Sequence, residues 1–259
     1  MHQTAEGDLA TVRRVIVIPA FNETDSLPLL IGELALCLSD VDLIIIADDS
    51  ATSIARETER RCRTLQTTTS CQLVFLSQTS KGGRGAAVRR GFDFALTFCP
   101  TAQWFLECDA DGSHRADDIM NVLEYPSHPH LVVGSRYLPN SHIVGWSLGR
   151  RIQSRILNIL IPLMLNLPLR DVTNGLRRYS RTATREIIKF PPTSSTFIYL
   201  TEQALIVQRR GLTIEEVPIR FEERRAGSSS VTWRELMASI KGLFQIIKVR
   251  SRFNSSMEV

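Results

Sequence analysis

The chain has 259 residues, of which 43% are hydrophobic and 22% charged, and its formal net charge is +4. This length suffices for one substantial hydrophobic core. The five cysteines contain no C-x-x-C pair, which argues against a disulfide framework and for reduced thiols. Residues 1–11 are polar and acidic and lack the basic start and apolar stretch of a secretion signal, so we expect the chain on the cytoplasmic side.

Short apolar runs predict five β-strands, and segments with helical periodicity separate most of them. The runs are residues 15–18, 43–46, 73–76, 104–108 and 131–133. This alternation is typical of one α/β domain with a mainly parallel sheet that helices cover on both faces. Polar residues follow three of the runs, at 19–23, 48–50 and 109–113. Because the carboxyl ends of parallel strands line one crevice, we expect a ligand site there.

A glycine-rich segment at residues 80–87 follows the third run. Glycines let a backbone come close to a phosphate, and the amino end of a helix favours anions, so Lys81 and Gly82 are candidates for a phosphate-binding loop. The segment lacks the G-x-x-x-x-G-K-S/T order of an ATPase loop. Taken alone, it is better explained as a tight turn between a strand and a helix.

Asp109 and Asp111 follow the fourth run, directly before a turn at residues 112–114. Two carboxylates two residues apart at the end of a buried strand both point outward from the sheet. They can hold a hard divalent cation such as Mg²⁺ or Mn²⁺, whose remaining positions go to substrate phosphates and water. The pair therefore indicates a nucleotide diphosphate site, although a solvated turn or a helix cap is the alternative for an isolated D-x-D.

Two later segments are rich in apolar residues. Residues 156–169 are apolar but contain two prolines and two asparagines. A bilayer-spanning helix needs about 20 apolar residues, so this segment belongs to the core or dips into a lipid interface. Between residues 233 and 247, apolar residues recur at helical spacing with basic residues on other faces. This pattern predicts an amphipathic helix that packs on the domain or on a membrane.

Basic residues are unevenly distributed along the chain. They concentrate in residues 136–185 and 209–252, and we expect these segments to meet phosphate or an acidic surface. The overall excess is mild, and we do not expect a nucleic acid among the partners.

The motifs, taken in their order from residue 15 to about residue 227, resemble those of the family-2 glycosyltransferases, and among them the dolichol- and polyprenol-phosphate mannosyltransferases. The matching segments are residues 17–23, 48–50, 109–111, 134–137, 145–154, 171–175 and 216–221. The resemblance implies a Rossmann-like GT-A domain over residues 12–227. It also implies a nucleotide diphosphate sugar as donor, most often GDP-mannose, and a polyprenyl or dolichyl phosphate as acceptor. Residues 228–259 would then be an amphipathic segment that contacts a membrane or a partner.

The same resemblance assigns roles to individual residues. The expected catalytic residues are Asp109, Asp111, Arg136 and Arg150, and the acceptor phosphate is expected at Arg136, Arg150 and Ser154. Mg²⁺ or Mn²⁺ is expected at Asp109, Asp111 and Ser113, where Ser113 replaces a glutamine common in these enzymes. The nucleotide sugar is expected at Pro19, Ala20, Phe21, Asn22, Glu23, Asp48, Asp49, Lys81, Gly82, Asp109, Ala110, Asp111 and Arg224.

A lipid phosphate acceptor would need no general base, because its second pKa is about 6 and its oxygen is ionised near neutral pH. A single displacement would then invert the anomeric configuration. Related enzymes with hydroxyl acceptors carry an acidic pair on the helix predicted over residues 197–210. Glu202 stands there between Thr201 and Gln203, so the pair is absent, which favours the base-free mechanism over Glu202 as base.

Other departures from the family pattern leave the substrates open. Residues 48–51 lack a glycine, residues 227–230 lack a lysine, and Asn174 replaces a small hydroxyl residue. A UDP-glucose type donor, a hydroxyl acceptor and a catalytically silent nucleotide-sugar-binding subunit are therefore competing interpretations. No transmembrane span follows the tail, so we expect peripheral contact with the cytoplasmic face of a membrane through the apolar segment, the tail or a small membrane subunit.

Overall fold

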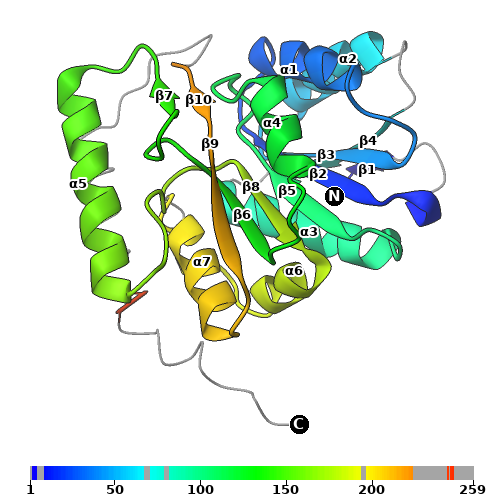
Figure 1. Ribbon diagram of the computed structural model, residues 1–259. Coiled ribbons are helices and arrows are strands. Elements are labelled where there is room, and N and C mark those ends of the chain that lie inside the picture. Colours follow the sequence, from blue (N-terminus) through cyan, green and yellow to red (C-terminus); the bar gives the residue numbers. More distant parts are fainter. Residues whose placement is uncertain are drawn as a thin grey trace, which may run out of the picture.

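Two β-sheets of unequal size organise the chain (Figure 1), and the computed structural model describes residues 2–4, 9–66, 71–78, 82–193, 197–223, 244, 246 and 247. The strands are β1 (His2–Thr4), β2 (Arg14–Ala20), β3 (Asp42–Asp48), β4 (Gln72–Ser77), β5 (Trp104–Glu107), β6 (Leu131–Ser135), β7 (His142–Ile143), β8 (Arg177–Ser180), β9 (Ile214–Pro218) and β10 (Arg220–Phe221). The larger sheet has eight strands in the order β1-β4-β3-β2-β5-β8-β6-β9, and β7 and β10 form the smaller one.

The larger sheet is mainly parallel, as the apolar runs predicted. Strands β2 to β6 coincide with the five runs, and together with β9 they share one direction. Every residue of β3 is buried, as expected for a strand with both faces covered. Two strands run against the others: β1 pairs with β4, and β8 lies between β5 and β6. No apolar run predicted β8.

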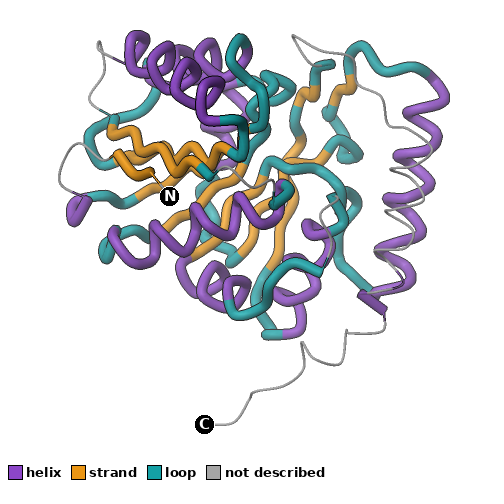
Figure 2. Tube along the Cα trace, turned by 180° about the vertical axis from the view of Figure 1, so that it is seen from behind, coloured by secondary structure: helices purple, strands orange, loops and turns teal. Residues whose placement is uncertain are grey.

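Helices cover both faces of the sheet (Figure 2). They are α1 (Ser26–Ala35), α2 (Thr52–Gln66), α3 (Arg84–Phe98), α4 (Ala116–Leu123), α5 (Leu148–Leu165), α6 (Arg181–Ile188) and α7 (Tyr199–Arg209), with a short 3-10 helix at Leu9–Thr11. Val15 and Val17 of β2 face the core formed with α3, α6 and α7, whereas Ile16 and Ile18 face the core formed with α1 and α4. This alternation along one strand confirms the single α/β domain.

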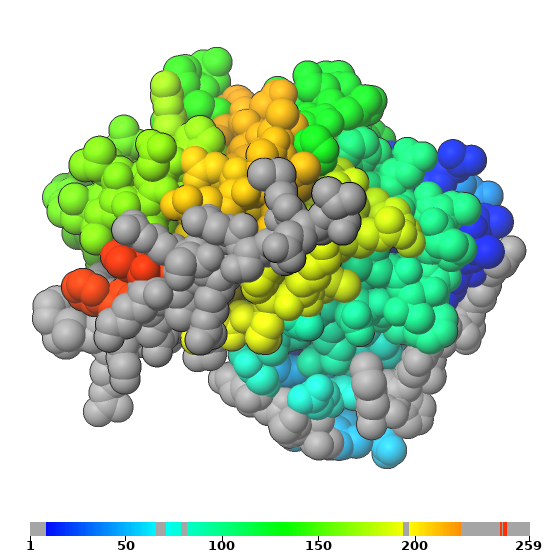
Figure 3. All heavy atoms as spheres, turned by 90° about the horizontal axis from the view of Figure 1, so that it is seen from below, coloured from blue at the N-terminus to red at the C-terminus, as the bar shows by residue number. Residues whose placement is uncertain are grey.

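Helix α5 lies at one edge of the molecule (Figure 1) and has two different faces. Ile161 and Leu165 are buried in the main core, whereas Leu148 and Leu163 are each 77% exposed. Ile246 joins the same core cluster, and residues 244, 246 and 247 lie beside α5 (Figure 3). The rest of the expected tail, residues 228–259, lies outside the described residues. The apolar segment 156–169 thus contributes one face to the core and leaves another uncovered.

Three arginines of the basic segment 136–185 bind main-chain carbonyls; Arg177 and Arg178 are buried, and Arg181 is half-buried. Arg177, Arg178 and Arg181 donate hydrogen bonds to main-chain carbonyls of neighbouring loops and helix ends. Arg178 also stacks on Trp104, with its Cζ atom 4.2 Å from the ring centroid. A buried carbonyl without a donor is costly, so these guanidinium groups stabilise the fold. For these three residues the expected contact with phosphate or an acidic surface is wrong.

Candidate active site

A cavity of about 250 Å³ lies where the carboxyl end of β5, the loop at residues 171–175 and the first turns of α5 meet. Its walls include Arg84, Asp109, Asp111, Arg136, Trp146, Arg150, Ser154, Thr173, Asn174, Gly175 and Phe221. The tertiary structure therefore brings the predicted metal-binding carboxylates and all three predicted acceptor residues to one pocket. We call this cavity the main pocket.

The acidic pair occupies the loop after β5, and each carboxylate has a different setting. Asp111 is 6% exposed and accepts a hydrogen bond from the main-chain N–H of Ser113 at 3.0 Å. The side chain of Asp109 is 23% exposed and forms an ion pair with Arg84. Gly112 between Asp111 and Ser113 has a φ of +73°, a conformation that costs a glycine little. The turn predicted at residues 112–114 thus holds the carboxylate of Asp111, whereas Arg84 holds that of Asp109.

The donor set suits a hard cation that keeps several positions for other ligands. Carboxylate oxygens are the protein ligands that Mg²⁺ and Mn²⁺ prefer. In the described part of the chain, no group of three or more His, Cys, Asp or Glu side chains is placed to hold a metal. Two aspartates would therefore act with substrate phosphates and water. Ser113, the third expected ligand, is buried with an unpartnered Oγ and does not line the main pocket, so its role stays a prediction.

His114 and Asn174 hold the acidic loop through a chain of hydrogen bonds. The Nδ1 atom of His114 accepts a hydrogen bond from the main-chain N–H of Asp109 at 3.3 Å, and its Nε2 atom lies 2.9 Å from Oδ1 of Asn174. Burial lowers the pKa of His114 to about 4, so the ring is neutral and carries its proton on Nε2. Asn174 donates in turn to the carbonyl of Gly134 at 2.5 Å. The only hint in the sequence was the position of His114 beside the acidic motif.

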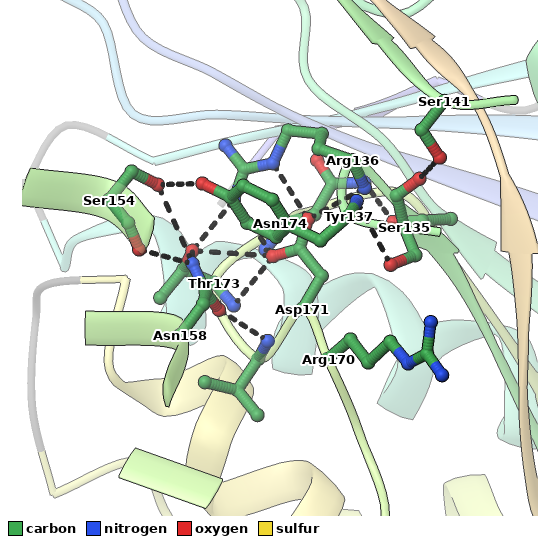
Figure 4. Close-up of polar contacts among 12 residues, drawn as sticks. Ser135, Arg136, Tyr137, Ser141, Ser154, Asn158, Arg170, Asp171, Thr173 and Asn174 are labelled. Carbon is green, nitrogen blue, oxygen red and sulfur yellow. Dashed lines mark hydrogen bonds and ion pairs between the residues drawn. The ribbon is translucent and has the colours of Figure 1, made fainter. Parts of the chain in front are cut away.

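Arg136 is fixed by a buried ion pair with Asp171 (Figure 4). Its Nε and Nη2 atoms lie 2.7 and 2.8 Å from the two carboxylate oxygens, and Nη2 also donates to Oγ1 of Thr173 at 2.7 Å. Burial alone would raise the pKa of Asp171, but the guanidinium outweighs it and holds that pKa below its usual range. Arg136 therefore presents a fixed positive charge to the main pocket.

Arg150 reaches the main pocket from the start of α5. Its Cζ atom stands 4.1 Å above the ring centroid of Trp146, and that of Arg136 lies 5.2 Å from the same ring. An aromatic ring attracts guanidinium groups through its negative face. Both predicted acceptor arginines therefore contact Trp146, and the ring orients Arg150.

Ser154 lies one turn further along α5. Its Oγ atom accepts a hydrogen bond from the hydroxyl of Tyr137 at 2.6 Å (Figure 4). Asn158, on the following turn, donates to Oγ1 of Thr173 at 2.9 Å and accepts from the main-chain N–H of Val172 at 2.7 Å. Asn158, which interrupts the apolar segment in the sequence, thus joins α5 to the loop that carries Asp171.

The predicted nucleotide segments lie at the ends of β2 and β3. Asp49 donates its main-chain N–H to the carbonyl of Ala20 at 3.0 Å, and Asn22 donates to Oγ of Ser50 at 2.8 Å. The carboxylate of Asp49 pairs with Arg90 at 2.7 Å and accepts from the N–H of Gly82 at 3.0 Å. Residues 19–23 and 48–50 therefore meet each other and the glycine-rich segment at Gly82.

The nucleotide-site assignments remain predictions. Residues 19–23, Asp48, Asp49, Gly82 and Ala110 are absent from the lining of the main pocket. Asp48 is buried and accepts from the main-chain N–H of Ser50 at 2.8 Å, and its burial raises its pKa. Lys81 and Arg224 lie outside the described residues.

Glu202 is separated from the acidic pair. It lines a second, smaller pocket with Gly85 and Tyr199, and contacts Thr193. Burial raises the pKa of Glu202 to about 7. A carboxylate must reach the acceptor proton to act as base, and Glu202 does not line the pocket that holds Asp109 and Arg136.

Comparisons with known proteins identify relatives of this chain. The chain is 28% identical over 235 residues to a polyprenol monophosphomannose synthase of Mycolicibacterium smegmatis, which covers 89% of this chain and 86% of that protein. It is 30% identical over 221 residues to an undecaprenyl-phosphate mannosyltransferase of Micrococcus luteus, covering 85% and 88%.

The fold is also that of a solved structure, glucosyl-3-phosphoglycerate synthase from Mycobacterium tuberculosis in complex with Mn²⁺, UDP and glucosyl-3-phosphoglycerate. The TM-score is 0.62 at 16% identity, over 93% of this chain and 81% of that chain. Residues 15–188 match the family described as glycosyl transferase family 2. The chain is thus a glycosyltransferase with the GT-A fold and belongs to glycosyl transferase family 2.

Proposed function

We propose that this glycosyltransferase transfers mannose from a nucleotide diphosphate sugar, GDP-mannose, to a polyprenyl phosphate. The observation that carries the proposal is the joining of Asp109 and Asp111 with Arg136 and Arg150 in one pocket. Carboxylates suit the metal of a sugar diphosphate, and guanidinium groups suit an acceptor phosphate. The names of the Mycolicibacterium and Micrococcus relatives support mannose as the sugar and a polyprenyl phosphate as the acceptor.

In this mechanism the chain positions two anions rather than moving a proton. Arg136, Arg150 and Ser154 hold the acceptor phosphate so that its oxygen faces the anomeric carbon of the sugar. As the bond from that oxygen to the anomeric carbon forms, the bond to the diphosphate breaks on the opposite side, and the configuration inverts. Asp109 and Asp111 would hold Mg²⁺ or Mn²⁺, which supplies positive charge beside the departing diphosphate.

The position of Glu202 favours the phosphate acceptor over a hydroxyl acceptor. A hydroxyl needs a base near the reacting oxygen, and Glu202 lines a different pocket from Arg136. A lipid phosphate arrives already ionised because its second pKa is about 6. The transfer assay described below distinguishes this proposal from a UDP-glucose type donor and from a catalytically silent binding subunit.

The uncovered face of α5 supports contact with a membrane. Its exposed apolar residues are Leu148, Ile152, Ile156, Ile159, Leu160, Leu163 and Met164. Arg150, Ser154 and Leu157 of the same helix line the main pocket. A lipid whose phosphate lies in that pocket could thus extend its chain toward the bilayer that α5 contacts. Within the described ranges, no helix is both long and apolar enough to cross a bilayer. We place the protein at the cytoplasmic face, where the tail or a small membrane subunit would add further contact.

The test is transfer from labelled GDP-mannose and UDP-glucose to a short-chain polyprenyl phosphate, with Mn²⁺ or Mg²⁺ and with EDTA. We expect a mannosyl product that needs the metal and is lost in Asp111→Ala. Asp117→Ala is the matched control, because the Asp117 side chain is 76% exposed and lies outside the main pocket. A glucosyl product alone would contradict the donor assignment. Transfer to free polyprenol but not to its phosphate would contradict the acceptor assignment, and donor binding without any transfer would favour the silent subunit.

A further inference from the structure

Arg84 lies at the first residue of α3 and lines the main pocket. Its Nη1 atom forms the ion pair with Oδ1 of Asp109. No sequence motif assigned Arg84 a role, because a single arginine in a glycine-rich turn has no pattern that separates it from a surface residue. In the folded chain its guanidinium contacts the expected metal ligand Asp109.

The guanidinium of Arg84 is held in place on its other sides. Its Nε atom donates to the hydroxyl of Tyr199 at 2.6 Å, and Nη2 donates to the carbonyl of Gly175 at 3.3 Å. The hydroxyl of Tyr199 donates to the fully buried carboxylate of Glu107 at 2.6 Å, and Nη2 of Arg84 lies 3.7 Å from that carboxylate. Tyr179 donates to the other oxygen of Glu107 at 2.8 Å. Arg84 is therefore fixed before any ligand binds.

Two glycines provide the space for this arrangement. A Cβ atom on Gly85 would lie 2.8 Å from Cγ of Tyr199, and one on Gly175 would lie 3.0 Å from Cζ of Arg84. The buried ring of Tyr199 has no room to move aside, and Arg84 could move only by leaving its partners. Both glycines thus permit the close approach of Arg84 and Tyr199 to the acidic loop.

We propose that Arg84 competes with the divalent cation for Asp109 and then binds the diphosphate of the donor. The inference rests on the proposed function, since it takes Asp109 and Asp111 as the metal ligands. While the guanidinium pairs with Asp109, it offsets the negative charge that attracts a cation and occupies Oδ1. When Asp109 turns to the metal, Nη1 is left facing the main pocket, where a guanidinium can bind phosphate oxygens. Arg84 would thereby make metal binding depend on the nucleotide.

The proposal predicts changes of opposite sign when the charge of Arg84 is removed. In Arg84→Met we expect Mn²⁺ alone to bind about tenfold more tightly than in the wild type, because its competitor is gone. With Mn²⁺ at saturation, we expect GDP and UDP to bind about tenfold more weakly, because a phosphate contact is lost. A variant that merely damaged the loop would weaken both. Arg84→Lys keeps the positive charge without the planar guanidinium. Its affinities for Mn²⁺ and for the nucleotides should lie between those of the wild type and of Arg84→Met.

Free Mn²⁺ measured by electron paramagnetic resonance gives the metal affinity, and calorimetry gives the nucleotide affinity. Arg89→Met is the matched control, since Arg89 lies on the same helix and lines the second pocket instead; both affinities should stay unchanged. If Arg84→Met does not fold, Arg84→Gln is also neutral and keeps a polar group for Tyr199 and Gly175, and the same signs are expected.

The outcomes separate the two proposals. A wild-type protein that binds Mn²⁺ neither alone nor with a nucleotide would refute the metal site itself. If the wild type binds Mn²⁺ and a neutral Arg84 variant binds it equally or less tightly, the proposed competition is wrong. The metal site itself would still be supported. Unchanged nucleotide affinity in that variant would overturn the diphosphate contact.

Discussion

The carboxylate of Asp171 accepts two hydrogen bonds of 2.7 and 2.8 Å from the guanidinium of Arg136, and a third of 3.0 Å from the main-chain N–H of the same arginine. Asp171 is fully buried and Arg136 is 8% exposed. A charge at this depth is stable only with its partner, so the pair both supports the fold and presents a guanidinium to the main pocket. This geometry makes the pair the first target for substitution.

Asp171→Asn should destabilise the protein by about 3–5 kcal/mol, because it leaves the charge of Arg136 buried and unpaired. Urea unfolding at pH 7 measures this change. Glu124→Gln is the matched control: Glu124 pairs with Arg14 at 3.0 Å but its side chain is 57% exposed, so its loss should cost less than about 1 kcal/mol. Equal losses of unfolding free energy in the two variants would show that the buried Asp171–Arg136 pair stabilises the protein no more than an exposed pair does.

The same pair predicts a loss of stability in acid. The folded-state pKa of Asp171 is below its value in the unfolded chain, so its contribution is present above the unfolded pKa of about 3.9 and fades as the pH falls through the folded value. The stability difference between wild type and Asp171→Asn should therefore shrink below about pH 4. A difference that stays constant from pH 7 to pH 3 would contradict the ionised state of Asp171.

For Glu202 we predict the opposite dependence of stability on pH. Burial raises its pKa to about 7 from an ordinary value of 4.5, so its contribution to stability is present below the unfolded value and is lost as the pH rises through 7. Glu202→Gln cannot ionise, and between pH 5 and pH 8 it should gain on the order of 1–3 kcal/mol relative to wild type. Unfolding curves at the two pH values check this.

The base-free mechanism adds a kinetic expectation for the same variant. Glu202→Gln should keep its transfer rate within about threefold, whereas loss of a general base typically costs about 100-fold or more. A rate collapse with donor and acceptor binding intact would restore Glu202 as the base and favour a hydroxyl acceptor.

Trp146→Leu should weaken the acceptor site while leaving the donor site intact. The substitution keeps apolar bulk but removes the ring 4.1 Å from Cζ of Arg150. A cation–π contact is worth about 0.5–2 kcal/mol, so the KM for polyprenyl phosphate should rise roughly 2- to 30-fold. The KM for the sugar nucleotide should change little, and Trp146→Phe should restore part of the loss. Equal increases in both KM values would point to general damage.

The exposed face of α5 should govern binding to lipid. Replacing Ile152 and Ile156, which are 60% and 49% exposed, by serine removes apolar surface that would insert into an interface, with little effect on folding. Liposome flotation should show reduced binding, and activity should fall with long-chain acceptors in vesicles but persist with a water-soluble short-chain one. The matched control is Leu29→Ser on α1, where Leu29 is 54% exposed. Equal flotation of all variants would move membrane contact to another surface.

Strand β8 shows where sequence patterns stop being informative. Arg177 and Arg178 are fully buried in this strand, although charged residues in a sequence ordinarily indicate surface. Their burial is stable because carbonyls from residues 123, 125, 127, 172, 174 and 200 converge on them. These carbonyls come from several separate segments, so no local pattern could have identified a central strand here.

From the sequence we could predict five strands of the large sheet, the acidic pair at the end of β5 and the family, because burial periodicity and short motifs are local properties of a chain. Which groups hold that site together became visible only in the folded protein. His114 and Asn174 are 60 residues apart, and Arg84 and Tyr199 are 115 apart. Hydrogen bonds and ion pairs depend on distances of a few ångströms in space, and only the packing of strands and helices brings such residues within reach.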